Sequence, residues 1–561
     1  MADGDTERDG GEYLYDALLA HGIDLLVGLP GTQTLPLDRV VGSREGIEYV
    51  MARHETAIPH VAWGHYEASG RPAATLTVPG PGETNAMHGL KNALEDCVPI
   101  VHITGDIHPD EMGKKPIHEI DPGTYDPVVK ENVRVTNAVD LPAAIERGIT
   151  AALTPPYGPV RLGIPNRIFD SAFSAPTVSV EPERISRDND SRFDQAADML
   201  GEAERPVVYV GGGVRRSPDG PAAIRALVDE LDATVVTSYK GKGVFPEDDP
   251  RFMGVTGSSL PPGARAALTH ADTVASFGTD FDGVTTAGWQ IPFGEQLIHV
   301  TLDPDAIDVA YESDLAIIED AGRAARAIRD RLSGREPPER WDPAKVGKAV
   351  RDEYLTYLTN EGAFDDTPEF TTPAVLHTIR ENIPRDTVVA LDVGGFRLWA
   401  LQAFEAYQPT EMIAAGSWAG MGVGLPAAIG AKLARPETPV VCLTGDGGLL
   451  MCIHELATAV EQELDIVIVV SNNRDFGIIS KKSGFRTEGG DHPFAWDPPS
   501  FPRIAEGFGC HGEAVDDAAA LSAALDSALD RDGPSLIDVD IPTKELTASD
   551  SSNFETDLTF D

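Results

Sequence analysis

The sequence predicts an α/β protein with three domains of parallel sheets flanked by helices. The chain has 561 residues, and domains of about 100–200 residues each divide that length into three or four units. Short runs rich in Val and Ile alternate with Ala-, Leu- and Glu-containing segments of helical period, which is typical of repeated βα units. Two polar, Pro-rich stretches, 172–194 and 333–368, interrupt this alternation and are interpreted as interdomain linkers.

These linkers set the predicted domain boundaries at 10–172, 195–332 and 369–545. The remaining residues, 546–561, contain acidic but no basic side chains from Thr547 onward. We expect them to form an acidic tail that frays from the last domain.

The composition is strongly acidic but otherwise that of a globular protein. Asp and Glu number 90 against 45 Lys and Arg, so the formal net charge is −45, while 42% of residues are hydrophobic. Such a charge repels nucleic-acid phosphates and anionic lipid, so we expect neither nucleic acid nor a membrane surface as a partner. The acidity is typical of proteins from salt-in halophiles and predicts an activity that requires salt. An unusually acidic mesophile protein is the alternative.

Cysteine usage and the chain start indicate a cytoplasmic protein. The four cysteines show no CxxC or Cys/His metal spacing, which suits a reducing compartment. The first residues are acidic and polar, unlike a signal or transit peptide. The uncharged run Met412–Ala431 is rich in Gly and Ala and too weakly apolar to span a membrane.

In the first two domains, the expected strands end at glycine-rich turns. Residues 23–27 lead into Gly28–Gly31, and residues 73–78 lead into Pro79–Gly82. The carboxyl ends of parallel strands are where such folds bind ligands. In the middle domain, RPVVYV precedes Gly211–Gly213, which lacks the GxGxxG spacing and is interpreted as a tight βα turn.

The third domain contains the most informative segment, residues 438–477. A strand over 440–443, a Gly445–Asp446–Gly447 turn, a helix with apolar positions from 449 to 460, and a strand over 466–470 form a predicted βαβ unit. Its parallel strands place Asp446 and Asn473 at one sheet edge. One carboxylate and one amide oxygen suit Mg²⁺, and the glycines leave backbone N–H groups for a diphosphate.

With GDG, 24 intervening residues and NN, this segment resembles the thiamine-diphosphate-dependent enzymes of the acetolactate synthase and 2-oxo acid decarboxylase group. The resemblance covers nearly the whole chain in the order pyrimidine-binding, central and diphosphate-binding domain. It implies Mg²⁺ and thiamine diphosphate as cofactors, with Asp446, Asn473 and the main-chain carbonyl of Asp475 as metal ligands. The other implied cofactor contacts in this segment are Gly445, Gly447, Gly448 and Gly477.

Two further motifs complete the implied active site. Arg53–His54–Glu55 looks like the family's RHE motif and implies Glu55 as the catalytic glutamate, hydrogen-bonded to N1′ of the aminopyrimidine. The segment Gly416–Gly422 resembles the stretch that bends the cofactor. Met421 would be the apolar wedge, and the Ala419 carbonyl would accept a bond from the 4′-amino group.

Other implied contacts lie at places where the chain departs from the synthases. Gly28, Pro30 and Gly31 match a loop near the pyrimidine, whereas Gly394, Gly395 and Phe396 stand where synthases have a Gly-Gln-His diphosphate contact. His118 replaces a synthase residue beside the substrate, where it would relay a proton or only occupy the position.

The central domain departs further, because it lacks the basic residues that meet FAD in the biosynthetic synthases. We therefore expect no FAD.

The resemblance implies decarboxylation of a 2-oxo acid followed by ligation to a second carbonyl compound, as in acetolactate synthase. A 2-oxo acid or acyl-CoA decarboxylase or lyase without ligation is the alternative, and a noncatalytic protein of the same fold is a third. The family also implies active sites shared between subunits, hence a homodimer or homotetramer.

Overall fold

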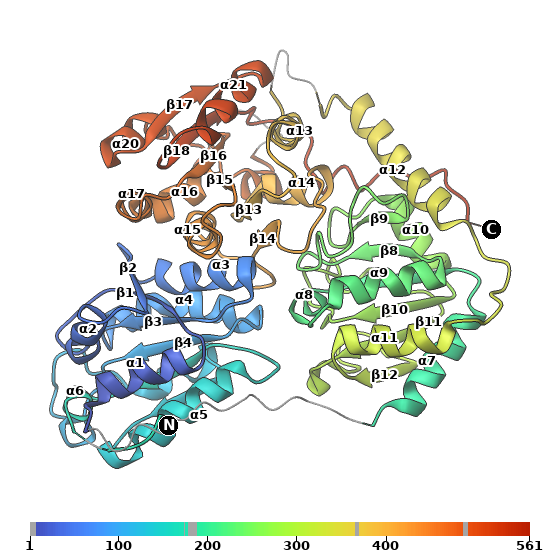
Figure 1. Cartoon of the computed structure of the whole chain (residues 1–561). Helices are drawn as coiled ribbons and strands as arrows, with labels where there is room; N and C mark the ends of the chain where they lie inside the picture. The colour runs from blue at the N-terminus through green and yellow to red at the C-terminus, as the bar shows by residue number, and fades with distance from the viewer. Residues whose placement is uncertain (1–6, 173, 178–187, 365–369, 486–491, 561) are drawn as a thin grey trace.

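Three six-stranded parallel sheets make up the protein, one in each third of the chain (Figure 1). The structure is a computed structural model that describes residues 7–172, 174–177, 188–364, 370–485 and 492–560. The predicted fold class is confirmed: each sheet is flanked by helices, and the βα alternation of the sequence matches the observed element order. Among the described helices, none is long and apolar enough to cross a membrane.

The N-terminal sheet has the strand order β2-β1-β3-β4-β6-β5. Its strands are β1 (Leu25–Gly28), β2 (Glu48–Met51), β3 (Ala73–Thr77), β4 (Ile100–Thr104), β5 (Glu131–Arg134) and β6 (Val160–Gly163). Its α-helices are α1 (Gly10–Ala20), α2 (Leu35–Val41), α3 (Ala57–Ser69), α4 (Pro81–Glu95), α5 (Leu141–Leu153) and α6 (Asn166–Phe169). Strands β3 and β4 are buried throughout, as expected of central strands covered on both faces.

The central sheet has the order β12-β11-β10-β7-β8-β9. Its strands are β7 (Pro206–Val210), β8 (Thr234–Thr237), β9 (Phe252–Val255), β10 (Thr273–Phe277), β11 (Gln296–Thr301) and β12 (Leu315–Ile318). The helices are α7 (Asp190–Glu202), α8 (Gly213–Arg216), α9 (Gly220–Leu231), α10 (Pro262–His270) and α11 (Ala321–Leu332). The Gly211–Gly213 turn leads directly into α8, as the interpretation of a βα turn required.

The C-terminal sheet has the order β14-β13-β15-β16-β18-β17. Its strands are β13 (Val388–Leu391), β14 (Met412–Ala414), β15 (Val440–Gly445), β16 (Ile466–Asn472), β17 (His511–Val515) and β18 (Ser535–Asp540). The helices are α13 (Thr372–Asn382), α14 (Gly395–Ala403), α15 (Gly424–Ala434), α16 (Asp446–Cys452), α17 (Leu456–Glu461), α18 (Gly477–Lys482), α20 (Phe501–Phe508) and α21 (Ala518–Leu529). The helix expected after the GDG turn is interrupted by a 3-10 turn, Ile453–Glu455, between α16 and α17.

Helices α3 and α15 join the N-terminal and C-terminal domains in one hydrophobic core (Figure 1). Small residues allow their backbones to touch. A Cβ on Gly64 would lie 2.3 Å from the carbonyl oxygen of Ala427, and a Cβ on Gly430 would lie 1.9 Å from that of Val61. The second half of the uncharged run Met412–Ala431 is therefore interior because it packs against another domain.

A buried ionic cluster connects all three domains. Glu67 at the end of α3 pairs with Arg216 (2.6 Å), Arg215 (3.0 Å) and Lys240 (3.0 Å) of the central domain. Lys240 also pairs with Asp96 at 3.0 Å, and Asp96 accepts a 3.1 Å hydrogen bond from the Gly416 amide of the C-terminal domain. The side chains of both acids are at most 2% exposed.

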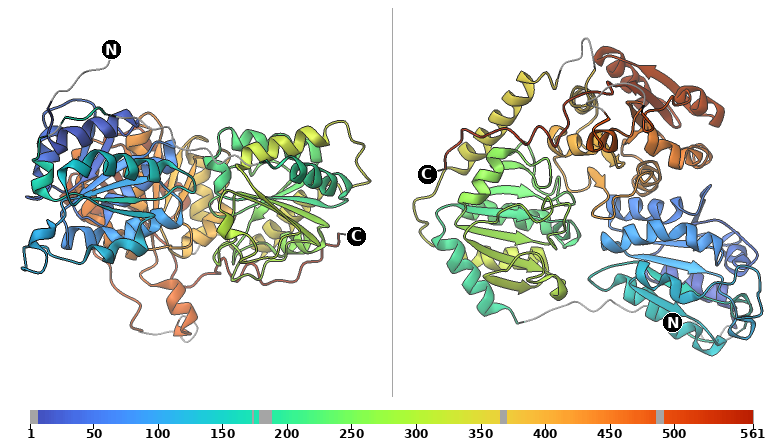
Figure 2. Two further views of the ribbon diagram at one scale, coloured as in Figure 1. Left: turned by 90° about the horizontal axis from the view of Figure 1, so that it is seen from below. Right: turned by 180° about the vertical axis from the view of Figure 1, so that it is seen from behind.

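Two expectations about the linkers and the tail need correction. Residues 333–368 contain the helix α12 (Pro343–Asn360), which packs on α10 and β9 of the central domain (Figure 2). Much of the other expected linker, 172–194, lies outside the described residues. The tail does not fray: Ser551 is buried against the Tyr354 hydroxyl at 2.8 Å, and Phe560 packs near Trp341. Phe554 and Leu558 of the tail also pack against hydrophobic cores of the protein.

Candidate functional site

The GDG turn and the NN pair lie at the same edge of the C-terminal sheet, as the sequence predicts. Strands β15 and β16 are hydrogen-bonded in parallel register, with Gly445 opposite Ser471. Asp446 is the first residue after β15, and Asn473 is the first residue after β16. This register fixes both side chains at the carboxyl end of the sheet, where an open α/β fold binds its ligands.

Asp446 is a buried carboxylate surrounded by neutral donors. Its Oδ1 accepts a 2.9 Å hydrogen bond from the Gly447 amide, and its Oδ2 accepts a 3.1 Å bond from Nε1 of Trp496. Burial raises the pKa of Asp446 to about 6, and these hydrogen bonds offset the rise only in part. A cation beside the carboxylate would stabilise its charged form.

Asn473 and Asp475 add further oxygen atoms at the same edge of the sheet, in the loop after β16. Asn473 Oδ1 accepts from the Asp475 amide at 3.1 Å. The Asp475 carboxylate accepts from the Ser480 hydroxyl, and its main-chain carbonyl accepts from the Gly477 amide at 2.8 Å. The predicted ligands are thus a carboxylate, an amide oxygen and a main-chain carbonyl, and this donor chemistry fits Mg²⁺.

The loop that carries Met421 is fixed by Asp392, a buried residue just after β13. Asp392 Oδ1 accepts from the Gly422 amide at 2.9 Å, and its Oδ2 accepts from the Thr444 hydroxyl at 2.8 Å. A Cβ on Gly447 would lie 3.5 Å from Met421 Cε, so the methionine lies against the GDG turn. The loop and the turn therefore form one continuous surface.

Glycines keep this surface open beside the turn. A Cβ on Gly448 would lie 2.6 Å from Asp392 Oδ2, so this position requires glycine. Gly394 and Gly395 begin α14, and the buried Phe396 ring lies near Gly445. Ala419 has a positive φ of 43°, a conformation that favours glycine. This glycine-lined surface beside the GDG turn fits a diphosphate held by backbone N–H groups.

In the N-terminal domain, the structure brings Glu55 and the first turn of α4 together. Glu55 is half-buried in the turn between β2 and α3, and its Oε2 accepts a 3.0 Å hydrogen bond from Asn85 Nδ2. The Thr56 hydroxyl donates to the Asn85 carbonyl at 3.1 Å. A Cβ on Gly82 would lie 3.3 Å from Glu55 Oε1, so the absence of a side chain there leaves space beside the carboxylate.

His118 lies near the other predicted loops of this domain. Its Nδ1 is 3.3 Å from Nε2 of Gln33, which follows the Gly28–Gly31 turn, and a Cβ on Gly80 would lie 2.7 Å from the His118 carbonyl. Pro30 is exposed, and Gly31 lies against Val78. The loops after β1 and β3 thus converge on the segment that contains His118.

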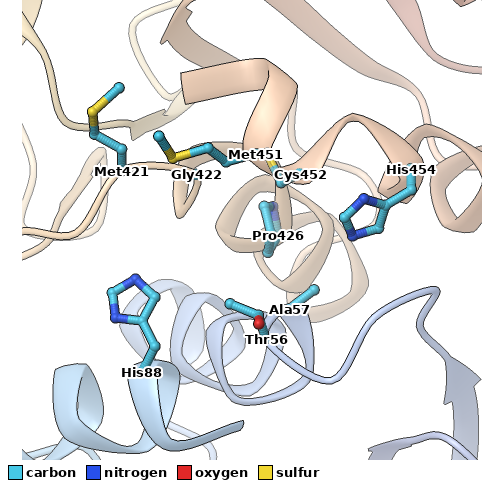
Figure 3. A pocket seen from close by; sticks show the side chains of 9 residues that line it. All are labelled: Thr56, Ala57, His88, Met421, Gly422, Pro426, Met451, Cys452 and His454. Atoms are coloured by element: carbon cyan, nitrogen blue, oxygen red, sulfur yellow. The ribbon is translucent and has the colours of Figure 1, made fainter. Parts of the chain in front are cut away.

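A cavity of about 450 Å³ lies between the N-terminal and C-terminal domains of the chain (Figure 3). His88 points into it from α4, whereas Pro426 and Met451 approach from the C-terminal domain. The cavity is lined by Thr56, Ala57, His88, Met421, Gly422, Pro426, Met451, Cys452 and His454. It places the residue after Glu55 and the predicted wedge Met421 on the walls of one space.

Sequence reasoning assigned no role to Asp392, Trp496 or Glu455. Asp392 is a carboxylate at the end of an apolar strand, which is the signal that identified Asp446. Glu455 interrupts an otherwise apolar helical face between Cys452 and Ala459, so its burial was detectable from the helical period. Trp496 lies 50 positions from its partner Asp446, and no local sequence pattern indicates their contact.

Comparisons with known proteins agree with this arrangement. Three domain models of thiamine pyrophosphate enzymes match the chain: the N-terminal TPP binding domain at residues 8–124, the central domain at 193–328 and the C-terminal TPP binding domain at 392–539.

Curated relatives match nearly the full length. The acetolactate synthase large subunit of Parasynechococcus marenigrum is 30% identical over 95% of this chain and 87% of its own. The large subunit of acetolactate synthase isozyme 2 from Escherichia coli is 29% identical over 96% of both chains. A probable acetolactate synthase large subunit of Methanocaldococcus jannaschii is 28% identical over 96% of this chain and 92% of its own. The chain therefore belongs to the thiamine pyrophosphate enzyme family, on the branch that contains the acetolactate synthase large subunits.

Proposed function

We propose that the protein is a thiamine-diphosphate- and Mg²⁺-dependent enzyme that decarboxylates a 2-oxo acid and ligates the product to a second carbonyl compound, as acetolactate synthase does. The observation that carries the proposal is that Asp446 and Asn473 follow the neighbouring parallel strands β15 and β16 at one sheet edge, with Met421 against the GDG turn. The full-length similarity to acetolactate synthase large subunits supports this reaction over others of the family.

Each group of residues has a defined task in this proposal. Asp446, Asn473 and the Asp475 carbonyl would hold Mg²⁺, and the glycine amides at the GDG turn would hold the diphosphate. The cofactor supplies a thiazolium ring that accepts the electron pair released when CO₂ leaves. Met421 would fill the space under the bent cofactor, and the Ala419 carbonyl would orient its amino group.

Glu55 would hold a proton at N1′ of the pyrimidine. The Asn85 hydrogen bond occupies Oε2, so Oε1 is the oxygen that we assign to this contact. Proton transfer by a positioned carboxylate contributes about 10²–10⁴-fold to a rate. We therefore expect Glu55→Gln to lower kcat by at least about 100-fold. Glu45→Gln, an exposed acid of the same domain, is the matched control and should keep full activity.

The experiment that tests the reaction uses the purified full chain in concentrated KCl with thiamine diphosphate, Mg²⁺ and pyruvate, with products followed by NMR. We expect acetolactate. Acetaldehyde without acetolactate would establish the decarboxylase alternative instead. A chain that binds the cofactor but turns over neither pyruvate nor other 2-oxo acids or acyl-CoA compounds would favour the noncatalytic alternative.

We further propose that the active protein is a homodimer or homotetramer whose sites combine Glu55 of one subunit with Asp446 of another. Mixing the inactive variants Glu55→Gln and Asp446→Asn tests this. If subunits exchange freely, half the dimers are hybrids with one intact site, and about a quarter of wild-type activity returns. If both residues act within one chain, no activity returns.

Two features of the central domain support the proposal that FAD is not a cofactor. Its glycine turn is closed, since the Gly213 amide donates to the Gly278 carbonyl at 2.9 Å. The cations Arg215, Arg216 and Lys240 are already paired with Glu67 or Asp96. We propose that the enzyme works without FAD. Added FAD should change neither activity nor the thermal midpoint.

The charge of −45 supports a proposal about the environment. We propose that the protein acts in the cytoplasm of a salt-accumulating cell, because carboxylates keep a surface hydrated in concentrated salt. Its activity should then rise with KCl concentration.

A further inference from the structure

A buried acid of the C-terminal domain binds the backbone that carries Glu55. Glu455 ends the 3-10 turn between α16 and α17, and its side chain is fully buried. Its Oε1 accepts hydrogen bonds from the amides of Arg53 and His54, each at 3.0 Å. Its Oε2 lies 3.2 Å from the Arg53 amide and accepts from the Thr458 hydroxyl at 2.6 Å.

The position of these amides explains why an acid is needed there. The last sheet-like bond of the segment joins the Ala52 amide to the Gly28 carbonyl, and the next bond between backbone groups joins the Ala57 amide to the His54 carbonyl. The amides of Arg53 and His54 lie between the strand and the helix, where neither element supplies an acceptor. Glu455 supplies it from another domain, and buried carboxylates bind such N–H groups strongly.

Glu55 is thereby positioned from two sides. The Glu455 bonds fix the backbone immediately before Glu55, and Asn85 binds its carboxylate. The same helical run begins at Asp446 and reaches Glu455 nine residues later. A predicted metal ligand and the anchor of the Glu55 backbone therefore share one short, continuous segment.

A second acid of this run provides a natural comparison. Glu461, at the end of α17, forms an ion pair with the guanidinium of Arg53, but its side chain is 45% exposed. Exposed ion pairs are screened and fix little. Glu461 touches the Arg53 side chain and not the backbone next to Glu55.

We propose that Glu455 is a positioning residue for Glu55: it holds the Arg53–His54 backbone across the domain interface so that the Glu55 carboxylate points to the pyrimidine. This inference rests on the proposed function for its kinetic consequence, but not for its structural one. The expected signature is a loss of kcat with little change in cofactor binding, because the metal and diphosphate contacts stay intact.

The structural arm measures amide hydrogen exchange in the full chain without cofactor. In Glu455→Ala we expect the Arg53 and His54 amides to exchange about tenfold faster, because a buried hydrogen bond is lost. In Glu461→Gln we expect exchange at these amides as in the wild type. Unchanged exchange in Glu455→Ala would overturn the proposal.

The kinetic arm compares Glu455→Ala, Glu455→Gln and Glu461→Gln with pyruvate as substrate. Small misplacements of catalytic groups cost up to about 100-fold, so Glu455→Ala should lose 10–100-fold in kcat and keep KM for thiamine diphosphate within about twofold. Glutamine retains Oε1 as an acceptor and donates its amide to Thr458, so Glu455→Gln should recover most of the rate. Loss of cofactor binding in Glu455→Gln, or equal kcat in all three variants, would overturn the positioning role.

The two arms separate the possible failures. If the wild type converts no 2-oxo acid, the proposed function fails while the exchange arm still decides whether Glu455 holds the segment. If Glu455→Ala does not fold, Thr458→Val and Glu455→Gln remain. In Thr458→Val the hydrogen bonds from the Arg53 and His54 amides to Glu455 persist, so these amides should still exchange slowly. Fast exchange there would contradict the role of Glu455 as their acceptor.

Discussion

Replacing Lys240 by methionine should destabilise the protein far more than replacing an exposed lysine. Lys240 Nζ lies 3.0 Å from both Glu67 Oε1 and Asp96 Oδ2, and its side chain is 13% exposed. At an effective dielectric constant of about 20, each contact is worth roughly 5 kcal/mol before desolvation. The cost of burying the lysine cancels much of this gain, and removing one partner of a buried pair costs about 3–5 kcal/mol in measured cases.

Most of that penalty should fall on Asp96. Glu67 keeps Arg215 and Arg216, whereas Asp96 keeps neutral donors, the indole of Trp63 at 3.0 Å and the Gly416 amide. Burial already raises the pKa of Asp96, and loss of Lys240 would raise it further. Protonation then relieves the unpaired charge, so the difference between Lys240→Met and wild type should shrink as the pH falls from 7.5 to 5.

The assay is urea unfolding in 2 M KCl, followed by the fluorescence of the tryptophans, which include Trp63 in the cluster. The matched control is Lys348→Met, which removes an exposed ion pair with Asp352 on α12 and should cost less than about 0.5 kcal/mol. Equal losses of unfolding free energy in the two variants would refute the assignment of a buried ionic cluster. So would a loss in Lys240→Met that does not depend on pH.

Three further predictions concern pH, backbone strain and salt. Burial raises the pKa of Glu67, but Lys240, Arg216 and Arg215 lower it to about 2, so its contribution to stability is complete above its ordinary value of 4.5 and is lost as the pH falls towards 2. The unfolding free energy should therefore decline more steeply below pH 4.5 in the wild type than in Glu67→Gln. Ala419→Gly should relieve the positive φ and raise the unfolding midpoint, whereas Ala419→Val should lower stability by about 1–2 kcal/mol; equal midpoints would contradict the strain. Raising KCl from 0.1 to 1 M shortens the screening length from about 10 to about 3 Å. The thermal midpoint should rise because repulsion between surface carboxylates is screened, and a falling midpoint would contradict this explanation.

The fold and half of the site follow from local sequence patterns. Alternating apolar runs indicate βα units, and strand ends predict where Asp446 and Asn473 meet, since chain direction alone fixes which edge they reach. The helix α12 escaped prediction because the prolines before it suggested a linker, although Val346, Val350, Tyr354 and Leu358 recur at a helical interval.

Contacts between distant segments could not be predicted in this way. Glu455 and Arg53 are separated by 402 positions, and no periodicity reports the partner of a buried acid. The same holds for Asp96 and Gly416, which belong to different domains and are joined by a hydrogen bond. The packing of whole domains, which depends on the summed shape of their surfaces, decides these contacts.

The ionic cluster constrains how this protein can move. Because Glu67 and Asp96 belong to one domain and Lys240 to a second, a rigid rotation of either domain against the other would separate buried ion pairs at a cost of several kcal/mol. A rotation of the third domain would break the hydrogen bond from the Gly416 amide to Asp96. Large hinge closures of the kind found in many ligand-binding proteins are thus disfavoured. Substrate entry should depend on smaller rearrangements at the rim, such as the turn bearing the exposed indole of Trp418, while the three sheets remain a fixed frame.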